Sequence, residues 1–490
     1  MATTTARVEA RSALDRFFKI SERGSTTGRE IRGGLVTFVT MAYIVVLNPL
    51  IIGSFSAQDG NAHRDAFGNI LPVGQVAAVT ALVAGVMTIL FGLIANYPFA
   101  MATGLGLNAF VAVSIAPQMS WPAAMGLVVV NGLVVLVLVV TGVRTMVFNA
   151  VPAALKSAIA VGIGLFITLI GLVDAGFVRR VPDAANTTVP VGLGINGSIA
   201  SWPTLVFVIG LVITGVLMAR RVRGALLIGV IATAVIAIIL EAIVNAGPSL
   251  GTNPKGWNLG YPAAPDDVVG IPDLSLVGDF NFDAWVQVPV ITAALLVFTL
   301  VLTDFFDTIG TMTGLGKEGG LLDPDGQLPG VGKALFVDGL GAVAGGAASS
   351  SSNTVYIESA SGIAEGARTG LANVVTGLLF IAAMFFTPLY QVVPIEAAAP
   401  ALVIVGVLMM AQVKEIDFSD FTIALPAFLT LVVMPFTFSI ANGIGAGFIS
   451  YVLLRLLTGR ARGIHPLMWI VSAAFVVYFA LGPIQAAING

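Results

Sequence analysis

The sequence predicts an all-α, polytopic membrane protein, and three observations carry that prediction. Of its 490 residues, 57% are apolar and only 10% are charged, and the mean hydropathy is +0.98. Soluble domains carry about 25% charged residues. The apolar residues gather into runs, most of them long enough for a membrane helix, and polar stretches rich in Gly and Pro separate these runs.

Charge and composition exclude several function classes. The net charge of −3 gives no basic footprint for nucleic acid. Cys is absent, which removes disulfides, thiolate metal sites and Cys nucleophiles. The two His residues, His63 and His465, lie far apart in polar connecting stretches. We therefore expect no metal and no cofactor.

The N-terminal segment, residues 1–30, is polar and mixed in charge. It has no apolar core followed by a small-residue cleavage site, so it predicts a cytoplasmic tail rather than a signal peptide. The first apolar run then anchors the chain in the cell membrane, as the first of many passes.

Fourteen candidate spans follow, in two sets of seven. The first set is 31–52, 74–95, 98–115, 123–143, 151–172, 203–219 and 224–244, and the second is 288–312, 331–347, 353–364, 369–390, 398–410, 421–436 and 442–457. A polar connection, residues 245–287, separates the sets. An odd number of spans in each half turns the halves upside down relative to each other, which is the inverted-repeat plan of secondary transporters.

Basic residues orient the spans. Those near 29–32, 220–223 and 455–462 all fall on one side if the N-terminus is cytoplasmic, and the 245–287 connection is then external. Arg179 and Arg180 are exceptions in an external connection. The final part, residues 461–490, contains an apolar segment, 466–484, that either lies along the membrane or crosses it once more.

Two acids interrupt the apolar run 295–316. Asp304 and Asp307 lie three residues apart and so share one helical face. An ionised Asp at the bilayer centre costs about 2.5–3.5 kcal/mol on insertion scales, which makes such a residue a functional candidate. The alternative is that both acids cap a helix end near water.

The third and tenth spans are poor helices at equivalent places in the two halves. Pro98, Gly104 and Gly106 favour extended or turn backbone in the third span, which also carries Asn108. A run of Ser leads to Asn353, Thr354 and Glu358 in the tenth. Short strands are therefore expected at both places, lining a binding site near the membrane centre. The alternative for the Ser run is close helix packing by small residues.

Five passages, in order along the chain, resemble the AzgA-type purine permeases of the nucleobase and ascorbate transporter superfamily. They are TFVTMAYIVVLNP, NYPFAMATGLGLNAFVA, TDFFDTIGT, SSSSNTVYIESASGIAEGARTGL and PAFLTLVVMPFTFSIANGIGAGFISY. The resemblance implies fourteen spans divided between a core domain, residues 31–150 and 288–392, and a gate domain, residues 151–244 and 393–460. It further implies proton-coupled import of adenine, guanine or hypoxanthine by elevator-like alternating access.

The resemblance also carries residue roles. The family's substrate-binding Asn, second Asp and Glu fall on Asn108, Asp307 and Glu358, with Gly106 and Thr354 beside them. Its first Asp falls on Asp304, a position that supports transport more than contact. The residues that match proton-coupling acids are Asp304, Asp307 and Glu358.

Physical chemistry agrees with these roles. A purine presents N–H donors and ring-nitrogen acceptors along one edge, carboxylates accept from such donors, and an amide such as that of Asn108 can do both. Carboxyl groups buried close together can bind and release a proton near neutral pH, either singly or jointly.

Other classes fit less well. An anion transporter of similar fold would need a cationic or neutral site where Asp307 and Glu358 lie. A diaspartyl intramembrane protease needs two Asp on different helices, whereas Asp304 and Asp307 share one. A channel or scaffold leaves the matched broken spans unexplained. Purine nucleobases and protons are thus the expected partners. Another nucleobase or a small anion is the alternative substrate. A homodimer is expected by analogy with other proteins of this fold.

Overall fold

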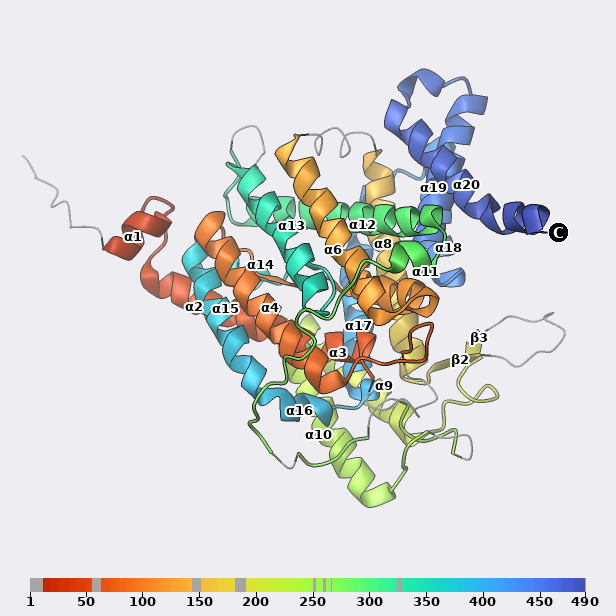
Figure 1. Ribbon diagram of the computed structural model, residues 1–490. Helices are drawn as coiled ribbons and strands as arrows, with labels where there is room; N and C mark the ends of the chain where they lie inside the picture. The colour runs from red at the N-terminus through yellow and green to blue at the C-terminus, as the bar shows by residue number, and fades with distance from the viewer. Residues whose placement is uncertain are drawn as a thin grey trace, which may run out of the picture.

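The computed structural model is a helical body in which strands are a minor part (Figure 1). It describes residues 12–54, 63–142, 151–180, 191–249, 253–258, 261–265, 267–323 and 328–489. Within these ranges, nine helices are long and apolar enough to cross a membrane, and four apolar helices are shorter. The chain is therefore a multi-pass helical protein, while the count of fourteen spans stays a prediction.

The elements follow the predicted runs closely. In the first half they are α1 (Ala13–Phe18), α2 (Thr27–Met41), α3 (Ile44–Ile52), α4 (Val73–Ile94), β1 (Met101–Thr103), α5 (Leu105–Phe110), η1 (Val111–Ile115), η2 (Ala116–Gln118), α6 (Trp121–Val140), α8 (Ala153–Asp174), β2 (Val178–Arg180), β3 (Val191–Leu193), α9 (Trp202–Ala219) and α10 (Ala225–Val244).

In the second half they are α11 (Ala284–Gln287), α12 (Val290–Glu318), α13 (Val331–Ala347), β4 (Asn353–Val355), α14 (Ser359–Ala364), α15 (Gly370–Ala383), η3 (Met384–Phe386), α16 (Thr387–Gln391), α17 (Ile395–Met410), η4 (Ala411–Glu415), α18 (Phe421–Phe436), α19 (Ile440–Leu457), η5 (Ala461–Gly463) and α20 (Pro466–Asn489).

Local chemistry sets several helix starts. α6 and α9 both begin with the sequence Ser-Trp-Pro. The side chains of Ser120 and Ser201 accept hydrogen bonds from the backbone N–H three residues later, and Pro in the first turn has no N–H that would be left unpaired. The same three residues therefore define the start of one helix in each packing group described below.

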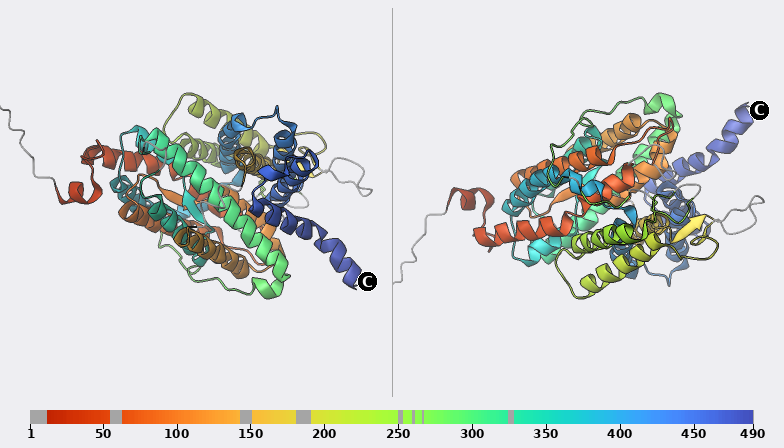
Figure 2. Two further views of the ribbon diagram at one scale, coloured as in Figure 1. Left: turned by 90° about the horizontal axis from the view of Figure 1, so that it is seen from above. Right: turned by 90° about the horizontal axis from the view of Figure 1, so that it is seen from below.

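The helices pack into two groups. The α4 bundle contains α2, α3, α4, α6, α13, α14 and α15, and the α8 bundle contains α8, α9, α10, α17, α18 and α19. Figure 1 draws the first mainly on the left and the second on the right and below. α12 contacts α6 of the first bundle and α8 and α19 of the second, and it runs across the body in the view from above (Figure 2).

Glycine lets the helices inside each bundle approach closely. A Cβ added to Gly85 of α4 would lie 2.8 Å from the carbonyl oxygen of Gly377 in α15, and one added to Gly132 of α6 would lie 2.9 Å from that of Gly339 in α13. Small residues at such crossings are typical of membrane helices, where van der Waals packing and hydrogen bonds replace the hydrophobic drive.

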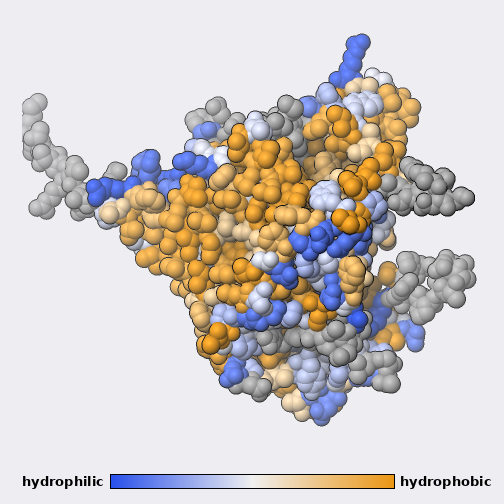
Figure 3. All heavy atoms as spheres, in the orientation of Figure 1, coloured by the Kyte–Doolittle hydropathy of each residue, from blue (hydrophilic) through white to orange (hydrophobic). Residues whose placement is uncertain are grey.

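A broad apolar surface covers the outside of the body. Figure 3 shows hydrophobic residues across the region of α4 and α15, with hydrophilic residues at the upper left, right of centre and in the lower part of the view. The exposed apolar side chains of α9 and α10 include Val212, Val216, Ile231, Val235, Ile239 and Ile243. A surface of this size and chemistry suits lipid rather than water.

β1 and β4 form an antiparallel pair inside the α4 bundle, as the two broken spans predict. Met101 pairs with Val355, and Thr103 with Asn353. The preceding Ser run is not part of a packed helix, because Ser349 and Ser351 have φ of 53° and 70° and form a turn. The alternative of close helix packing is therefore wrong for these residues.

An ion-pair cluster joins the two bundles at one end of the molecule. The Glu365 carboxylate, at the end of α14, accepts from Arg32 Nε of α2 at 2.7 Å and from Arg223, in the loop between α9 and α10. The Glu365 side chain is only 8% exposed, whereas that of Arg223 is 65% exposed. This loop is thereby tied to the α4 bundle.

α20 forms from the last apolar segment as a single helix. Phe475 is buried against Phe448 of α19, while the far end of α20 extends away from the body (Figures 1 and 2). The described residues thus give α20 one docked face, and both sequence interpretations of this segment stay open.

Candidate functional site

A cavity of about 100 Å³ lies between the two bundles. One wall comes from the α4 bundle with α5 and β4, a second from α12, and a third from α8 and α17. The lining residues are Tyr43, Gly104, Leu105, Gly106, Leu107, Ile163, Ile167, Thr303, Asp307, Thr311, Val355, Tyr356, Ile357, Glu358, Val405 and Met409.

α12 presents two polar faces. Thr303, Asp307 and Thr311 all line the cavity and are spaced four residues apart, which places them along one side of the helix. Asp304 and Thr308 point elsewhere, into the α4 bundle. The two acids that the sequence places on one helical face therefore have different surroundings.

Glu358 reaches the cavity from the segment between β4 and α14, where it is the residue that precedes the helix. Its Oε1 accepts a hydrogen bond of 2.6 Å from the hydroxyl of Tyr43, at the junction of α2 and α3. The Thr40 hydroxyl donates to the Glu358 backbone carbonyl at 3.4 Å. The junction of α2 and α3 thus holds Glu358 in place.

Asp304 does not line the cavity. Its Oδ2 accepts from Asn131 Nδ2 of α6 at 3.2 Å and from the Ser352 hydroxyl at 3.4 Å. The carboxylate therefore connects α12 to α6 and to the Ser turn. That Asp304 supports transport more than direct contact, as the resemblance implies, stays a prediction.

Thr354 belongs to a second buried network. Its hydroxyl lies 2.7 Å from that of Thr308 and donates to Asp338 Oδ1 of α13 at 3.3 Å. Thr308 also donates to both oxygens of Asp338, at 2.9 and 2.8 Å. Thr354 is thus placed behind the cavity wall and not in its lining.

Asn108 and Gly106 also differ in whether they line the cavity. Gly106 lines the cavity, and an added Cβ would lie 2.6 Å from Ile163 Cγ2 of α8. Asn108 is fully buried two residues further along α5, where its Nδ2 donates to Thr103 Oγ1 at 3.1 Å. Its Oδ1 has no hydrogen-bond partner among the described residues. The structure therefore brings together Gly106, Asp307 and Glu358, with Asn108 behind them.

Three neighbouring residues were not predicted. Thr303 lines the cavity with a buried hydroxyl that has no partner within the described part of the chain, and its spacing from Asp307 is a usable signal. Asp338 interrupts the apolar run of α13, which is another. Tyr43 gives no sequence signal, because an aromatic residue in an apolar run is usually ordinary core.

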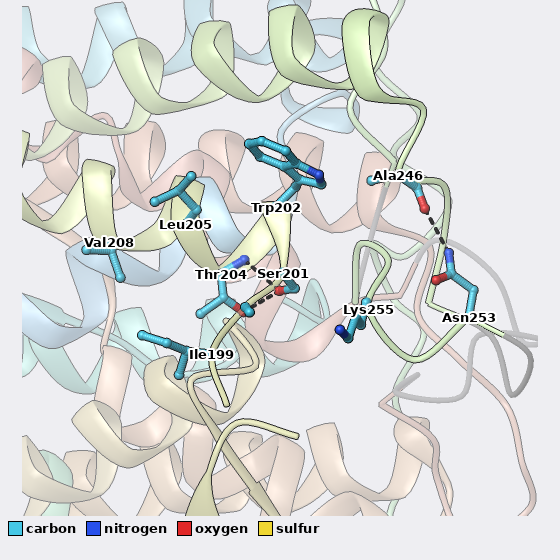
Figure 4. Close-up of a pocket in the computed structure, with 10 residues that line it drawn as sticks. Ile199, Ser201, Trp202, Thr204, Leu205, Val208, Ala246, Asn253 and Lys255 are labelled. Atoms are coloured by element: carbon cyan, nitrogen blue, oxygen red, sulfur yellow. Dashed lines mark hydrogen bonds between the residues drawn. The ribbon is translucent and has the colours of Figure 1, made fainter. Parts of the chain in front are cut away.

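A larger hollow of about 650 Å³ lies at the start of α9 (Figure 4). Ser201 and Thr204 hydrogen-bond there, as do Asn253 and Ala246, and Trp202, Leu205 and Lys255 complete much of its lining. No carboxylate lines it among the residues that the structure describes, and its apolar side chains Ile199, Trp202 and Leu205 are exposed. The smaller cavity between the bundles is therefore the candidate site.

Comparisons with known proteins show that this chain is similar to permeases over most of its length. The sequence profile of the permease family matches residues 28–446. A guanine/hypoxanthine permease of Bacillus subtilis is 39% identical over 471 residues, which cover 94% of this chain and 98% of that protein. An adenine permease of Escherichia coli is 36% identical over 480 residues, which cover 96% of this chain and 97% of that protein.

Among solved structures, the transmembrane domain of a cyanobacterium bicarbonate transporter, BicA, superposes with a TM-score of 0.55. The alignment covers 86% of this chain and 96% of that one, with 14% sequence identity. At this identity the likeness concerns the fold alone.

Proposed function

This chain belongs to the permease family and is a transporter rather than an enzyme, and from that premise we propose that it imports purine nucleobases with protons. The proposed substrates are adenine, guanine and hypoxanthine. Two relatives that align over nearly their whole length, at 39% and 36% identity, are named for these bases, which makes a nucleobase the best-supported class.

The single observation that carries the proposal is the pair of carboxylates, Asp307 and Glu358, in a cavity between the two bundles. A purine edge carries N–H donors that carboxylates accept, while the apolar side chains of Leu105, Ile163 and Val405 suit the ring faces. A site of this kind discriminates strongly, because an analogue without the donors leaves buried acceptors unpaired.

Proton coupling uses the same carboxylates. Asp307 and Glu358 come from different elements and line one cavity that no cationic residue lines, among the side chains described. Two acids that lack a counter-ion are most easily accommodated when one of them holds a proton. Exchange of that proton as the cavity opens to either side would couple import to the proton gradient.

Alternating access would come from movement of one bundle against the other. In this proposal the α4 bundle with α12 is the core domain and the α8 bundle is the gate. Packing partners support an inverted repeat: α4 packs on α15 and α13 on α6, while α8 packs on α18 and α17 on α9. In span order, α4 corresponds to α13 and α6 to α15, while α8 corresponds to α17 and α9 to α18. Exchanging corresponding helices therefore converts the α4–α15 pair into the α13–α6 pair, and the α8–α18 pair into the α17–α9 pair.

Orientation follows from the basic residues. We propose a cell-membrane protein with a cytoplasmic N-terminus, so that a reporter fused after Arg221 reads cytoplasmic and one fused in the 245–287 connection reads external. The reverse pattern would overturn this orientation. We further expect a homodimer formed through the α8 bundle, and the molecular mass of the purified protein tests this expectation.

Uptake of radiolabelled adenine, guanine and hypoxanthine into proteoliposomes tests the function. We expect saturable uptake that an inward proton gradient drives and a protonophore abolishes. A small anion is the alternative substrate, since a bicarbonate transporter shares the fold. Uptake of bicarbonate in place of any purine would reject the proposal, and purine uptake without response to the protonophore would reject the coupling.

A further inference from the structure

The hydroxyl of Tyr43 is the side-chain group that holds the Glu358 carboxylate. The donor and acceptor oxygens are 2.6 Å apart, the Tyr43 side chain is fully buried, and both residues line the cavity. Hydrogen bonds of this length to a carboxylate are charge-assisted and roughly twice as strong as neutral ones. The bond leaves Oε2 of Glu358 as the second acceptor of the group.

The other groups around Glu358 do not duplicate this bond. Asp307, from α12, is an acid, and the hydroxyl of Tyr356 is engaged by the Thr103 carbonyl oxygen. The side chains that line the cavity from α8 and α17 are apolar: Ile163, Ile167, Val405 and Met409. Among the described residues, Tyr43 is therefore the donor whose loss would change the surroundings of the Glu358 carboxylate most.

We propose that Tyr43 is a positioning residue that makes substrate recognition depend on the protonation state of Glu358. While Glu358 is ionised, the phenol donates to Oε1 and fixes the carboxylate, so that Oε2 can accept from a purine N–H. When Glu358 is protonated on Oε2, that oxygen becomes an O–H donor and no longer accepts from a purine N–H, while the phenol bond to Oε1 becomes a weaker, neutral one. No proton leaves Tyr43 in this exchange, and the inference of a purine ligand rests on the proposed function.

The variant Tyr43→Phe removes the hydroxyl and keeps the ring. Tyr97→Phe is the matched control, because the Tyr97 side chain is 1% exposed and its hydroxyl makes a bond of the same 2.6 Å, to the carbonyl oxygen of Pro329 away from the cavity. We expect Tyr43→Phe to weaken purine binding by about tenfold, as loss of a bond to a charged group does, and Tyr97→Phe to leave it unchanged.

A measurement without ligand separates this inference from the proposed function. The phenol stabilises the ionised form of Glu358, so its contribution to the thermal midpoint should be largest at high pH and should shrink as the pH falls and the carboxylate gains a proton. The midpoint difference between wild type and Tyr43→Phe should follow that trend. In a Glu358→Gln background, the same substitution should have one effect at every pH.

Each outcome decides something. A Tyr43→Phe effect that is independent of pH in both backgrounds would overturn the positioning role and leave Tyr43 as ordinary core. A wild-type protein that binds no purine would reject the proposed function, while the pH series still decides the role of Tyr43. A Tyr97→Phe variant with the same pH trend would show that the trend does not come from Glu358, and would overturn the inference.

Discussion

Asp307 and Glu358 reach one cavity from different elements, and this difference separates their expected roles. Glu358 is held by Tyr43, so its amide variant should mainly change recognition. Glu358→Gln puts donors where the carboxylate only accepted, and we expect it to change the order of purine affinities. Asp307→Asn keeps the shape of the side chain but cannot take up a proton, so binding and exchange should persist while accumulation against a gradient is lost.

Counterflow and gradient-driven uptake, measured side by side in proteoliposomes, distinguish these results. Swapped phenotypes would exchange the two roles. If both variants accumulate purine with the wild-type dependence on external pH, neither carboxylate carries the coupled proton, and Asp304 is the next residue to replace.

Asn108 tests how far the binding site extends behind the cavity wall. Its Oδ1 is buried without a hydrogen-bond partner among the described residues, so a small movement could offer it to a donor on the base. We expect Asn108→Ala to weaken purine binding about tenfold, the effect of roughly 1.4 kcal/mol, with normal expression. Isothermal titration with each purine measures this, and unchanged affinity for all three would remove Asn108 from the site.

At the scale of single residues, sequence pattern identified the acids but not their partners. Asp304 and Asp307 are conspicuous because charge is costly in an apolar run. Which acid faces the cavity depends on how α12 is rotated against α6, and Asn131 and Ser352 decide that by bonding to Asp304. Tyr43 lies 315 positions before Glu358, and no local spacing connects them.

At the scale of elements, the residue types at the ends of the apolar runs predicted the helices and strands better than the spacing of apolar residues within the runs. The bounds 331–347 and 421–436 match α13 and α18, because polar residues bracket those apolar runs. Gly, Pro and Ser predicted the extended backbone of β1 and β4. The register between the two strands could not be predicted, because both are three residues long and carry no alternating pattern.

Gly106 lets α5 pack closely against α8, so adding one carbon there should disturb the packing between the two bundles. A Cβ would lie 2.6 Å from Ile163 Cγ2, and overpacking of this kind costs about 1–3 kcal/mol. We expect Gly106→Ala to slow uptake and lower the thermal midpoint, and Ile163→Ala in the same chain to restore part of both. Gly215→Ala is the control, since nothing lies within 4 Å of its added Cβ.

A result in which Ile163→Ala restores nothing would mean that Gly106 serves the backbone or the ligand and not the packing against α8. That outcome would favour the substrate-binding role that the family resemblance implies for Gly106.

At the scale of the whole molecule, the Glu365 cluster links the two bundles. Any sliding of one bundle past the other has to separate Glu365 from Arg223. We expect Glu365→Gln to change the balance between conformations by about two- to fivefold, as the loss of a partly exposed ion pair worth ~0.5–1 kcal/mol would. Both Arg side chains are more than half exposed, so the variant should still fold.

The chain contains no Cys, so one introduced thiol can report this balance. Thr311→Cys lines the cavity, and its rate of reaction with a membrane-impermeant maleimide measures how open the cavity is. Glu22→Gln is the control, because Glu22 pairs with Lys19 inside one short segment on the exposed surface. Equal labelling rates with and without Glu365→Gln would mean that the cluster does not influence opening.

The strand pair has a consequence for how the protein is made. Thr103 pairs with Asn353, and 353 minus 103 is 250, so the ribosome has to add 250 residues before the first strand can meet its partner. At about 5–20 residues per second, the nascent first half waits for roughly 12–50 s. Thr88 of α4 bonds the N–H and C=O of Met101, but the β1 groups that face β4 are unpaired in an apolar environment during that time. The insertion machinery, or another part of the nascent chain, therefore has to shelter this edge until the second half arrives.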